Sequence, residues 1–81
     1  MLKIYGHMQC PDCVRCRKEL DAAKVEYVYL DFSDSLRNLK EFLILREQDP
    51  QFREVREKGG IGIPCIVRED GSITFVWEEY M

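Results

Sequence analysis

The four cysteines are the residues of this 81-residue sequence whose type and spacing could carry out chemistry. Cys10, Cys13 and Cys16 follow one another at intervals of three, and the fourth is Cys65. This content is below the roughly 8–10% that is typical of a disulfide scaffold, and so close a cluster cannot join distant segments. In a reducing compartment such a cluster indicates redox chemistry or metal binding. The sequence therefore predicts a thiol site near its N-terminus.

The first two cysteines belong to the motif Cys10-Pro11-Asp12-Cys13. An apolar run over residues 2–5 predicts a buried strand before the motif, and Pro11 fits the first position of a helix. Only a thiolate attacks a disulfide, and the free N–H groups and partial positive charge of a helix N-terminus stabilise that anion. The pattern predicts Cys10 as the nucleophile at the cap and Cys13, one turn later, as the resolving thiol.

Apolar periodicity predicts two longer helices. The apolar face of the helix that begins at Pro11 consists of Cys13, Cys16, Leu20 and Ala23. A second helix is expected after a cap at Ser33 or Asp34. Its apolar face consists of Leu36, Leu39, Phe42 and Leu43.

A short third helix is expected directly after the second. Asp49 and Pro50 end the second helix and can serve as the cap and first position of the next one. Phe52 and Val55 form its inner face, and Gly59 ends it.

The remaining strands complete one α/β domain over residues 1–81. Strands are predicted at residues 26–32, 65–67 and 73–77, and Asp70-Gly71 is a hairpin signal between the last two. The order is β-α-β-α-(α)-β-β. The first two strands, joined by a helix, are expected to be parallel with a right-handed crossover, and the closing hairpin adds an antiparallel pair. We therefore expect a four-stranded mixed sheet flanked by helices.

Over nearly its whole length the chain resembles the glutaredoxin branch of the thioredoxin-like proteins. The resemblance rests on the first strand, the Cys-Pro-Asp-Cys helix start, the element order and the pair Ile63-Pro64. It implies a thioredoxin-like fold and a dithiol oxidoreductase that reduces disulfides of proteins or small molecules through Cys10 and Cys13, with no organic cofactor. It also implies that Pro64 is a cis-proline facing the motif and that the Ile63 backbone binds the extended chain of a substrate.

Two segments differ from the glutaredoxins that use glutathione. In those proteins a Gly-Gly turn and an acidic residue follow the last hairpin, whereas this chain continues with residues 75–79, Phe-Val-Trp-Glu-Glu. A Lys usually precedes the motif, where this chain has His7-Met8-Gln9. These differences weigh against glutathione as a co-substrate.

The electron donor is expected to be a reductase or glutathione. The final helix of the family is expected to be missing or reduced to residues 77–81.

A different class of function is also open to the four thiols. Together, Cys10, Cys13, Cys16 and Cys65 could bind zinc or an iron–sulfur cluster, because thiolates are the preferred ligands of both. The simpler interpretation is that Cys16 and Cys65 are small buried residues of the core. His7, in the loop before the motif, is either a plain polar residue or a group that tunes a thiolate.

Composition excludes several other classes. The net charge of −3, with basic and acidic residues interleaved, argues against nucleic acid as a partner. No apolar run approaches the ~20 residues that a membrane span needs, and the start of the chain lacks the apolar core of a secretory signal. The expectation is a cytoplasmic protein with no membrane or nucleic-acid partner.

Overall fold

A four-stranded mixed sheet forms the centre of this computed structural model, which describes residues 1–81. The strands are β1 (Leu2–Gly6), β2 (Tyr27–Asp31), β3 (Cys65–Val67) and β4 (Ile73–Thr74), in the order β2-β1-β3-β4. β1 pairs in parallel with β2, and β3 is antiparallel to both β1 and β4. The predicted four-stranded mixed sheet and its element order are confirmed.

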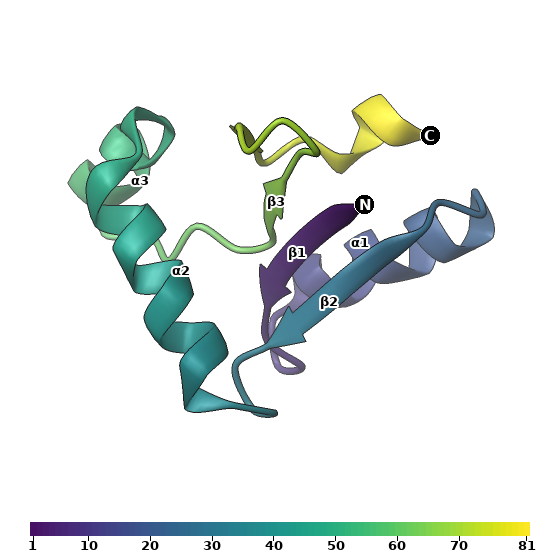
Figure 1. The fold of residues 1–81 in the computed structure, drawn as a ribbon, viewed down its shortest axis with the longest axis horizontal. Coiled ribbons are helices and arrows are strands. Elements are labelled where there is room, and N and C mark those ends of the chain that lie inside the picture. The colour runs from purple at the N-terminus through teal and green to yellow at the C-terminus, as the bar shows by residue number, and fades with distance from the viewer.

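Helices cover both faces of this sheet (Figure 1). They are α1 (Pro11–Ala22), α2 (Leu36–Gln48), the 3₁₀ turn η1 (Pro50–Phe52), α3 (Arg53–Glu57) and a second 3₁₀ turn, η2 (Trp77–Tyr80). α1 and η2 lie on one face, and α2, η1 and α3 lie on the other. The C-terminal helix is reduced to η2, as expected. None of the helices combines the length and apolar character that crossing a membrane requires.

The alternation of side chains along β1 divides the core into two layers. Ile4 faces α1, and the next residue, Tyr5, faces α2, because successive side chains of a strand point to opposite faces. The buried layer on the α1 side consists of Leu2, Ile4, Cys16, Leu20, Ile66 and Trp77. The layer on the α2 side consists of Tyr5, Phe42, Phe52, Cys65 and Ile73. The sheet therefore separates Cys16 from Cys65.

The cap and the buried face of α2 differ from the prediction. Ser35, not Ser33 or Asp34, is the cap, and its hydroxyl accepts the Arg37 N–H at 3.1 Å. Ser33 instead donates to the buried Asp31 carboxylate at 2.6 Å, which fixes the turn after β2. Because α2 begins directly after Ser35, Leu36 is 80% exposed and Leu43 is 45% exposed. The residues that pack inward are Leu39, Phe42 and Leu45.

The short third helix matches its prediction. The Asp49 carboxylate accepts the Gln51 N–H at 2.9 Å, and Pro50 occupies the first turn. Phe52 is fully buried and Val55 packs beside it. Gly59 follows the helix with a φ of +73°, a conformation that glycine adopts at little cost.

Two element ends also differ from the prediction. Ala23 lies beyond the last turn of α1 and is exposed, so the buried stripe of that helix ends at Leu20. The last strand stops at Thr74 instead of reaching residue 77, because the Thr74 hydroxyl accepts the Val76 N–H at 3.1 Å. The chain then turns into η2 and buries Trp77 on the α1 side.

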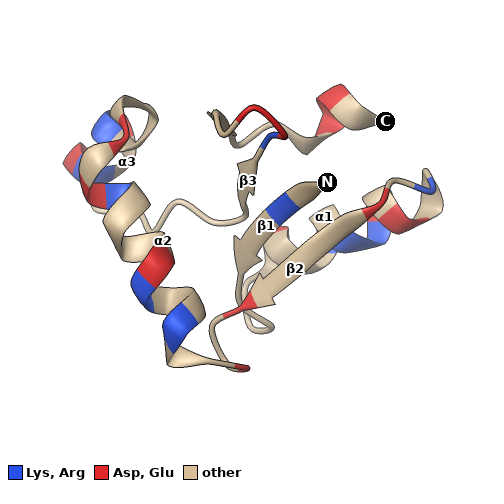
Figure 2. Ribbon diagram, in the orientation of Figure 1, with Lys and Arg blue, Asp and Glu red and all other residues tan.

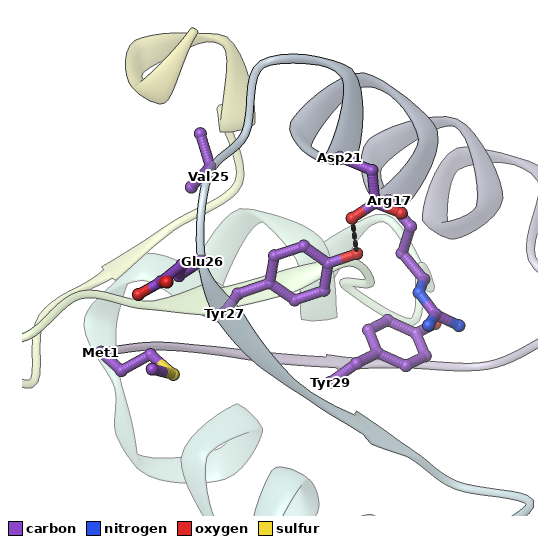
Figure 3. Close-up of a pocket in the computed structure, with 7 residues that line it drawn as sticks. All are labelled: Met1, Arg17, Asp21, Val25, Glu26, Tyr27 and Tyr29. Atoms are coloured by element: carbon purple, nitrogen blue, oxygen red, sulfur yellow. Dashed lines mark hydrogen bonds between the residues drawn. The ribbon is translucent and has the colours of Figure 1, made fainter.

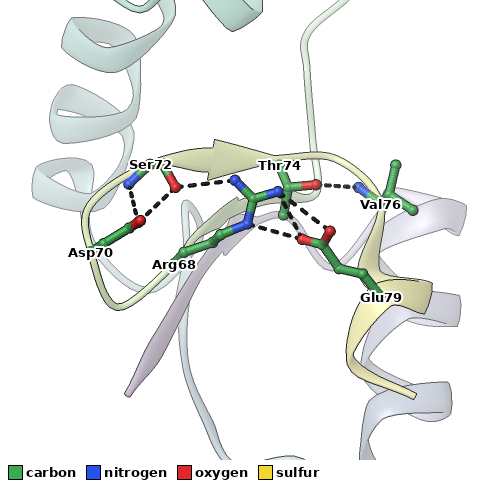
Figure 4. Close-up of polar contacts among 6 residues, drawn as sticks. All are labelled: Arg68, Asp70, Ser72, Thr74, Val76 and Glu79. Carbon is green, nitrogen blue, oxygen red and sulfur yellow. Dashed lines mark hydrogen bonds and ion pairs between the residues drawn. The ribbon is translucent and has the colours of Figure 1, made fainter.

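Polar contacts around the β3–β4 turn attach the C-terminal segment to the sheet (Figure 4). Gly71 has a φ of +89°, as the predicted Asp70-Gly71 turn requires, and Asp70 accepts the Ser72 N–H at 2.9 Å. Arg68 donates to the Ser72 hydroxyl and to Glu79 of η2, both at 3.0 Å. These contacts hold η2 against the end of the sheet.

Charged residues of both signs are interleaved on the helices (Figure 2). Several pair within one helix, such as Arg37 with Glu41 at 3.5 Å and Lys58 with Glu54 at 2.9 Å. Exposed pairs of this kind contribute little to stability. They are the solvated helix faces that the interleaved sequence predicts.

Two substitutions in α2 test which face of the helix is buried. Phe42→Ala removes a ring that is 1% exposed and is expected to lower the free energy of unfolding by about 3–5 kcal/mol. Leu36→Ala removes an exposed side chain and is expected to change it by less than about 0.5 kcal/mol. Urea unfolding followed by circular dichroism measures both. A cost of several kcal/mol for Leu36→Ala would contradict the observed orientation of α2.

Candidate functional site

Cys10 is the N-cap residue of α1, as predicted. Its backbone is extended, with φ −87° and ψ 115°, and Pro11 occupies the first turn of the helix. The Cys13 N–H donates to the Cys10 Sγ at 3.2 Å, and the Cys10 N–H donates to the His7 carbonyl at 3.0 Å. Cys10 is half-buried, whereas the other three thiols are buried. The structure thus places one accessible sulfur where helix N–H groups stabilise negative charge.

Cys13 lies one turn further along and is 0% exposed. Burial raises the pKa of the Cys13 thiol to about 12, and the neighbouring Cys10 acts in the same direction. The His7 backbone and the Tyr29 hydroxyl oppose this and lower the pKa of Cys13. The pair therefore combines one accessible sulfur with one shielded sulfur.

Gly6 allows the start of α1 to lie close to β1. A Cβ at this position would lie 2.9 Å from the Cys13 Sγ and 2.5 Å from the Tyr29 hydroxyl oxygen. Real Cβ atoms essentially never approach other atoms so closely. A side chain at position 6 would therefore displace the Cys13 thiol or the tyrosine. Sequence reasoning missed both residues, since the predicted strand over residues 2–5 stopped before Gly6 and Tyr29 was one residue of the predicted strand over residues 26–32.

Cys16 and Cys65 lie in the two different core layers. Cys16 packs with Leu20 on the α1 side, and Cys65 packs with Phe52 on the α2 side. Burial is the main cause that raises the pKa of Cys16 to about 11 and that of Cys65 to about 12. No three cysteine, histidine or acidic side chains form a group that could hold a metal ion. The arrangement places Cys16 and Cys65 as buried core residues and does not gather the four thiols into one ligand set.

Ile63 and Pro64 lie opposite the motif. The peptide bond between them is cis, as the resemblance implied. The Ile63 carbonyl oxygen is 4.0 Å from the Cys10 Sγ, the long distance of a weak thiol hydrogen bond. The Ile63 N–H has no hydrogen-bond partner within the protein. Backbone groups of this segment are thus available next to the accessible sulfur.

A largely apolar groove of about 400 Å³ opens beside Cys10. Its lining consists of His7, Gln9, Cys10, Phe32, Leu39, Ile61 and Ile63. Sequence reasoning found Cys10 and Ile63 but not the groove, because its walls come from four separate segments of the chain. None of the lining residues carries a permanent charge.

The side chain of His7 forms part of the wall of this groove. Its Nδ1 accepts the Gln9 N–H at 3.1 Å, and its ring lies 6.5 Å from that of Phe32, measured between centroids. The backbone of His7, through its carbonyl, holds Cys10 at the cap. The His7 ring thus contacts Gln9 and Phe32, and both predicted roles of its side chain stay predictions.

Differences in accessibility predict which thiol reacts in the native protein. Iodoacetamide added to the reduced, folded chain at neutral pH is expected to label Cys10, because the other three sulfurs are shielded from solvent. After unfolding in urea, all four cysteines are expected to react. Peptide mass spectrometry locates the labels. Labelling of Cys16 or Cys65 in the folded protein as fast as Cys10 would contradict this arrangement.

The buried thiols also predict a loss of stability in alkaline solution. Folding raises the pKa of Cys16 to about 11 and those of Cys13 and Cys65 to about 12, whereas unfolded cysteines ionise near pH 8.5. Above that pH the unfolded chain releases protons that the folded chain retains, so the free energy of unfolding falls as pH rises.

The urea midpoint of the reduced protein is therefore expected to be constant from about pH 7 to 8 and to fall between about pH 9 and 11. A Cys65→Ala variant is the control, and its midpoint is expected to depend less steeply on pH. A midpoint that stays constant up to pH 11 would show that the thiols are not shielded.

Comparison with known proteins places the chain beside one bacterial relative. An uncharacterized protein of Haemophilus influenzae (strain ATCC 51907 / DSM 11121 / KW20 / Rd) is 34% identical over 64 residues, which cover 79% of this chain and 74% of the relative. No family model and no solved structure matches. The chain belongs to the same protein family as this Haemophilus influenzae protein.

Proposed function

We propose that this chain is a thiol–disulfide oxidoreductase that reduces disulfides of proteins or small molecules through Cys10 and Cys13. We further propose that its fold is thioredoxin-like and of the glutaredoxin type. The strand order β2-β1-β3-β4 with helices on both faces supports this fold. A reducing compartment such as the cytoplasm would keep the pair in its dithiol form.

The placement of Cys10 is the observation that carries the proposal. Its sulfur is the one accessible thiol of the chain, and it accepts the Cys13 N–H at 3.2 Å at the first turn of α1. Unpaired N–H groups at a helix N-terminus favour the thiolate, which is the attacking species. Cys13 lies in the same turn and is therefore placed to attack a disulfide formed on Cys10.

The reaction has two exchange steps. The Cys10 thiolate attacks a substrate disulfide, the substrate S–S bond breaks, and the first substrate thiolate leaves as a mixed disulfide forms. The Cys13 thiol then loses its proton, attacks the Cys10 sulfur and releases the second substrate thiolate. The substrate has gained two electrons, and the protein holds a Cys10–Cys13 disulfide. A reductase or glutathione supplies the electrons that restore the dithiol.

The segment opposite the motif supports binding of an extended substrate. The Ile63 N–H is unpaired and next to Cys10, so it can donate to a substrate backbone carbonyl. The adjoining groove has walls from Phe32, Leu39 and Ile61 and no Lys or Arg. Such a lining suits an apolar side chain beside the substrate cysteine. It contains no Lys or Arg side chain that could pair with the carboxylates of glutathione, which weighs against that tripeptide as the preferred substrate.

Three single substitutions test the assigned roles. Cys10→Ser is expected to abolish disulfide reduction, because it removes the attacking sulfur. Cys13→Ser is expected to form a mixed disulfide that accumulates, because the resolving thiol is gone. Cys16→Ser is expected to retain exchange within about threefold, since Cys16 is buried in the core away from the reacting pair. Insulin reduction and intact-mass spectrometry measure these outcomes. Full activity of Cys10→Ser would exclude the proposed function.

A further inference from the structure

The Tyr29 hydroxyl and the Cys13 thiol both lie against Gly6. Both lie within 3 Å of the point where a Cβ of residue 6 would be, the hydroxyl oxygen at 2.5 Å and the sulfur at 2.9 Å. Tyr29 lies on β2, Gly6 lies on β1 and Cys13 lies on α1, so three elements bring these groups together. This juxtaposition at Gly6 is not used in the function proposed above, and its interpretation rests on that function.

The resolving step presents a chemical difficulty at Cys13. Its sulfur must become a thiolate to attack the mixed disulfide, yet it is fully buried and burial opposes ionisation. The Asp31 carboxylate already accepts both the N–H and the hydroxyl of Ser33 through its Oδ1. The groups that lower the pKa of Cys13 are the His7 backbone and the Tyr29 hydroxyl.

We propose that Tyr29 is the hydrogen-bond donor that stabilises the Cys13 thiolate during the resolving step. The phenol O–H is directed to the sulfur as the thiol proton leaves to solvent, and the tyrosine itself stays neutral. The thiolate then attacks the Cys10 sulfur, the bond from Cys10 to the substrate sulfur breaks, and the Cys10–Cys13 bond forms. The released substrate thiolate takes up a proton from solvent, so the protein carries the same net charge after the step as before it.

The surroundings of Tyr29 keep it in the form of a donor. Burial, followed by the charges of Cys13 and Asp31, raises the pKa of Tyr29 above its ordinary value, so its proton is retained at neutral pH. The Arg17 guanidinium lies over the ring at 4.0 Å from its centroid and fixes the ring from the outer side (Figure 3). Tyr29 is therefore a fixed, neutral O–H group beside the buried sulfur.

Tyr27 provides a matched control on the same strand. It lies two residues before Tyr29, so both side chains point to the α1 face of the sheet. Its hydroxyl donates to the Asp21 carboxylate at 2.6 Å, as Figure 3 shows, whereas the hydroxyl that lies beside Gly6 with Cys13 is that of Tyr29. Removing either hydroxyl leaves the ring in place, but only Tyr29→Phe removes a donor to the thiolate.

The test separates the two exchange steps in one reaction. One equivalent of the chromogenic disulfide dithiobis(nitrobenzoate) releases a first thionitrobenzoate when Cys10 attacks and a second when Cys13 resolves the mixed disulfide. Stopped-flow absorbance follows both releases in the wild type, Tyr29→Phe and Tyr27→Phe. Equal urea midpoints of the three proteins at neutral pH show that each is folded.

We expect the first release to be unchanged in Tyr29→Phe and the second to be slower by about 10- to 100-fold, the effect of losing a hydrogen bond to a charged group. The pH midpoint of the second release is expected to move upward by about one unit or more, which loss of packing alone would not cause. Tyr27→Phe is expected to behave like the wild type.

Other outcomes are equally informative. A second release in Tyr29→Phe that matches the wild type in rate and pH midpoint would overturn the role of Tyr29, and so would an equal loss in Tyr27→Phe. By contrast, a wild-type protein that shows no first release, or no second one, would refute the oxidoreductase function itself. The failure of this inference is thus distinct from the failure of the proposed function.

Discussion

The start of α1 packs onto β1 at Gly6, at a distance that only a residue without a Cβ permits. This close approach places the first turn of the helix over the end of the strand. Cys10 consequently lies at the rim, next to residues 61–63, while Cys13 is covered. One sulfur is thus accessible and the other is shielded, and the proposed division of chemistry between them depends on this difference.

The sheet decides which other thiols can take part. Side chains alternate between its faces, and the register pairs Ile4 with Ile66 and Tyr5 with Cys65. Cys65 therefore points away from α1, although it follows the Ile63-Pro64 pair that faces Cys10. Cys16 remains on the α1 side but inside the core. A two-cysteine centre, rather than a four-thiol ligand set, is what this register supports.

The neighbours of the reacting pair are polar but carry little charge. Cys10 is held by backbone groups of His7 and Cys13, and the adjoining groove contains no Lys or Arg. The side-chain group that favours the Cys13 thiolate is a neutral tyrosine hydroxyl. A charged group at the same place would change the pKa of Cys13 more strongly. Oriented N–H and O–H dipoles, instead of ionised side chains, are thus the means of stabilising both thiolates in the proposed reaction.

By itself the sequence determined the features that depend on a few consecutive residues. Pro11 after Cys10 defined the helix start, Asp49-Pro50 the short third helix and Asp70-Gly71 the last turn, because caps and turns are local hydrogen-bond patterns. Only the tertiary structure decided the groove beside Cys10. The same holds for the meeting of Tyr29 with Cys13. These depend on strand register and on packing between segments far apart in the chain, which local periodicity does not encode.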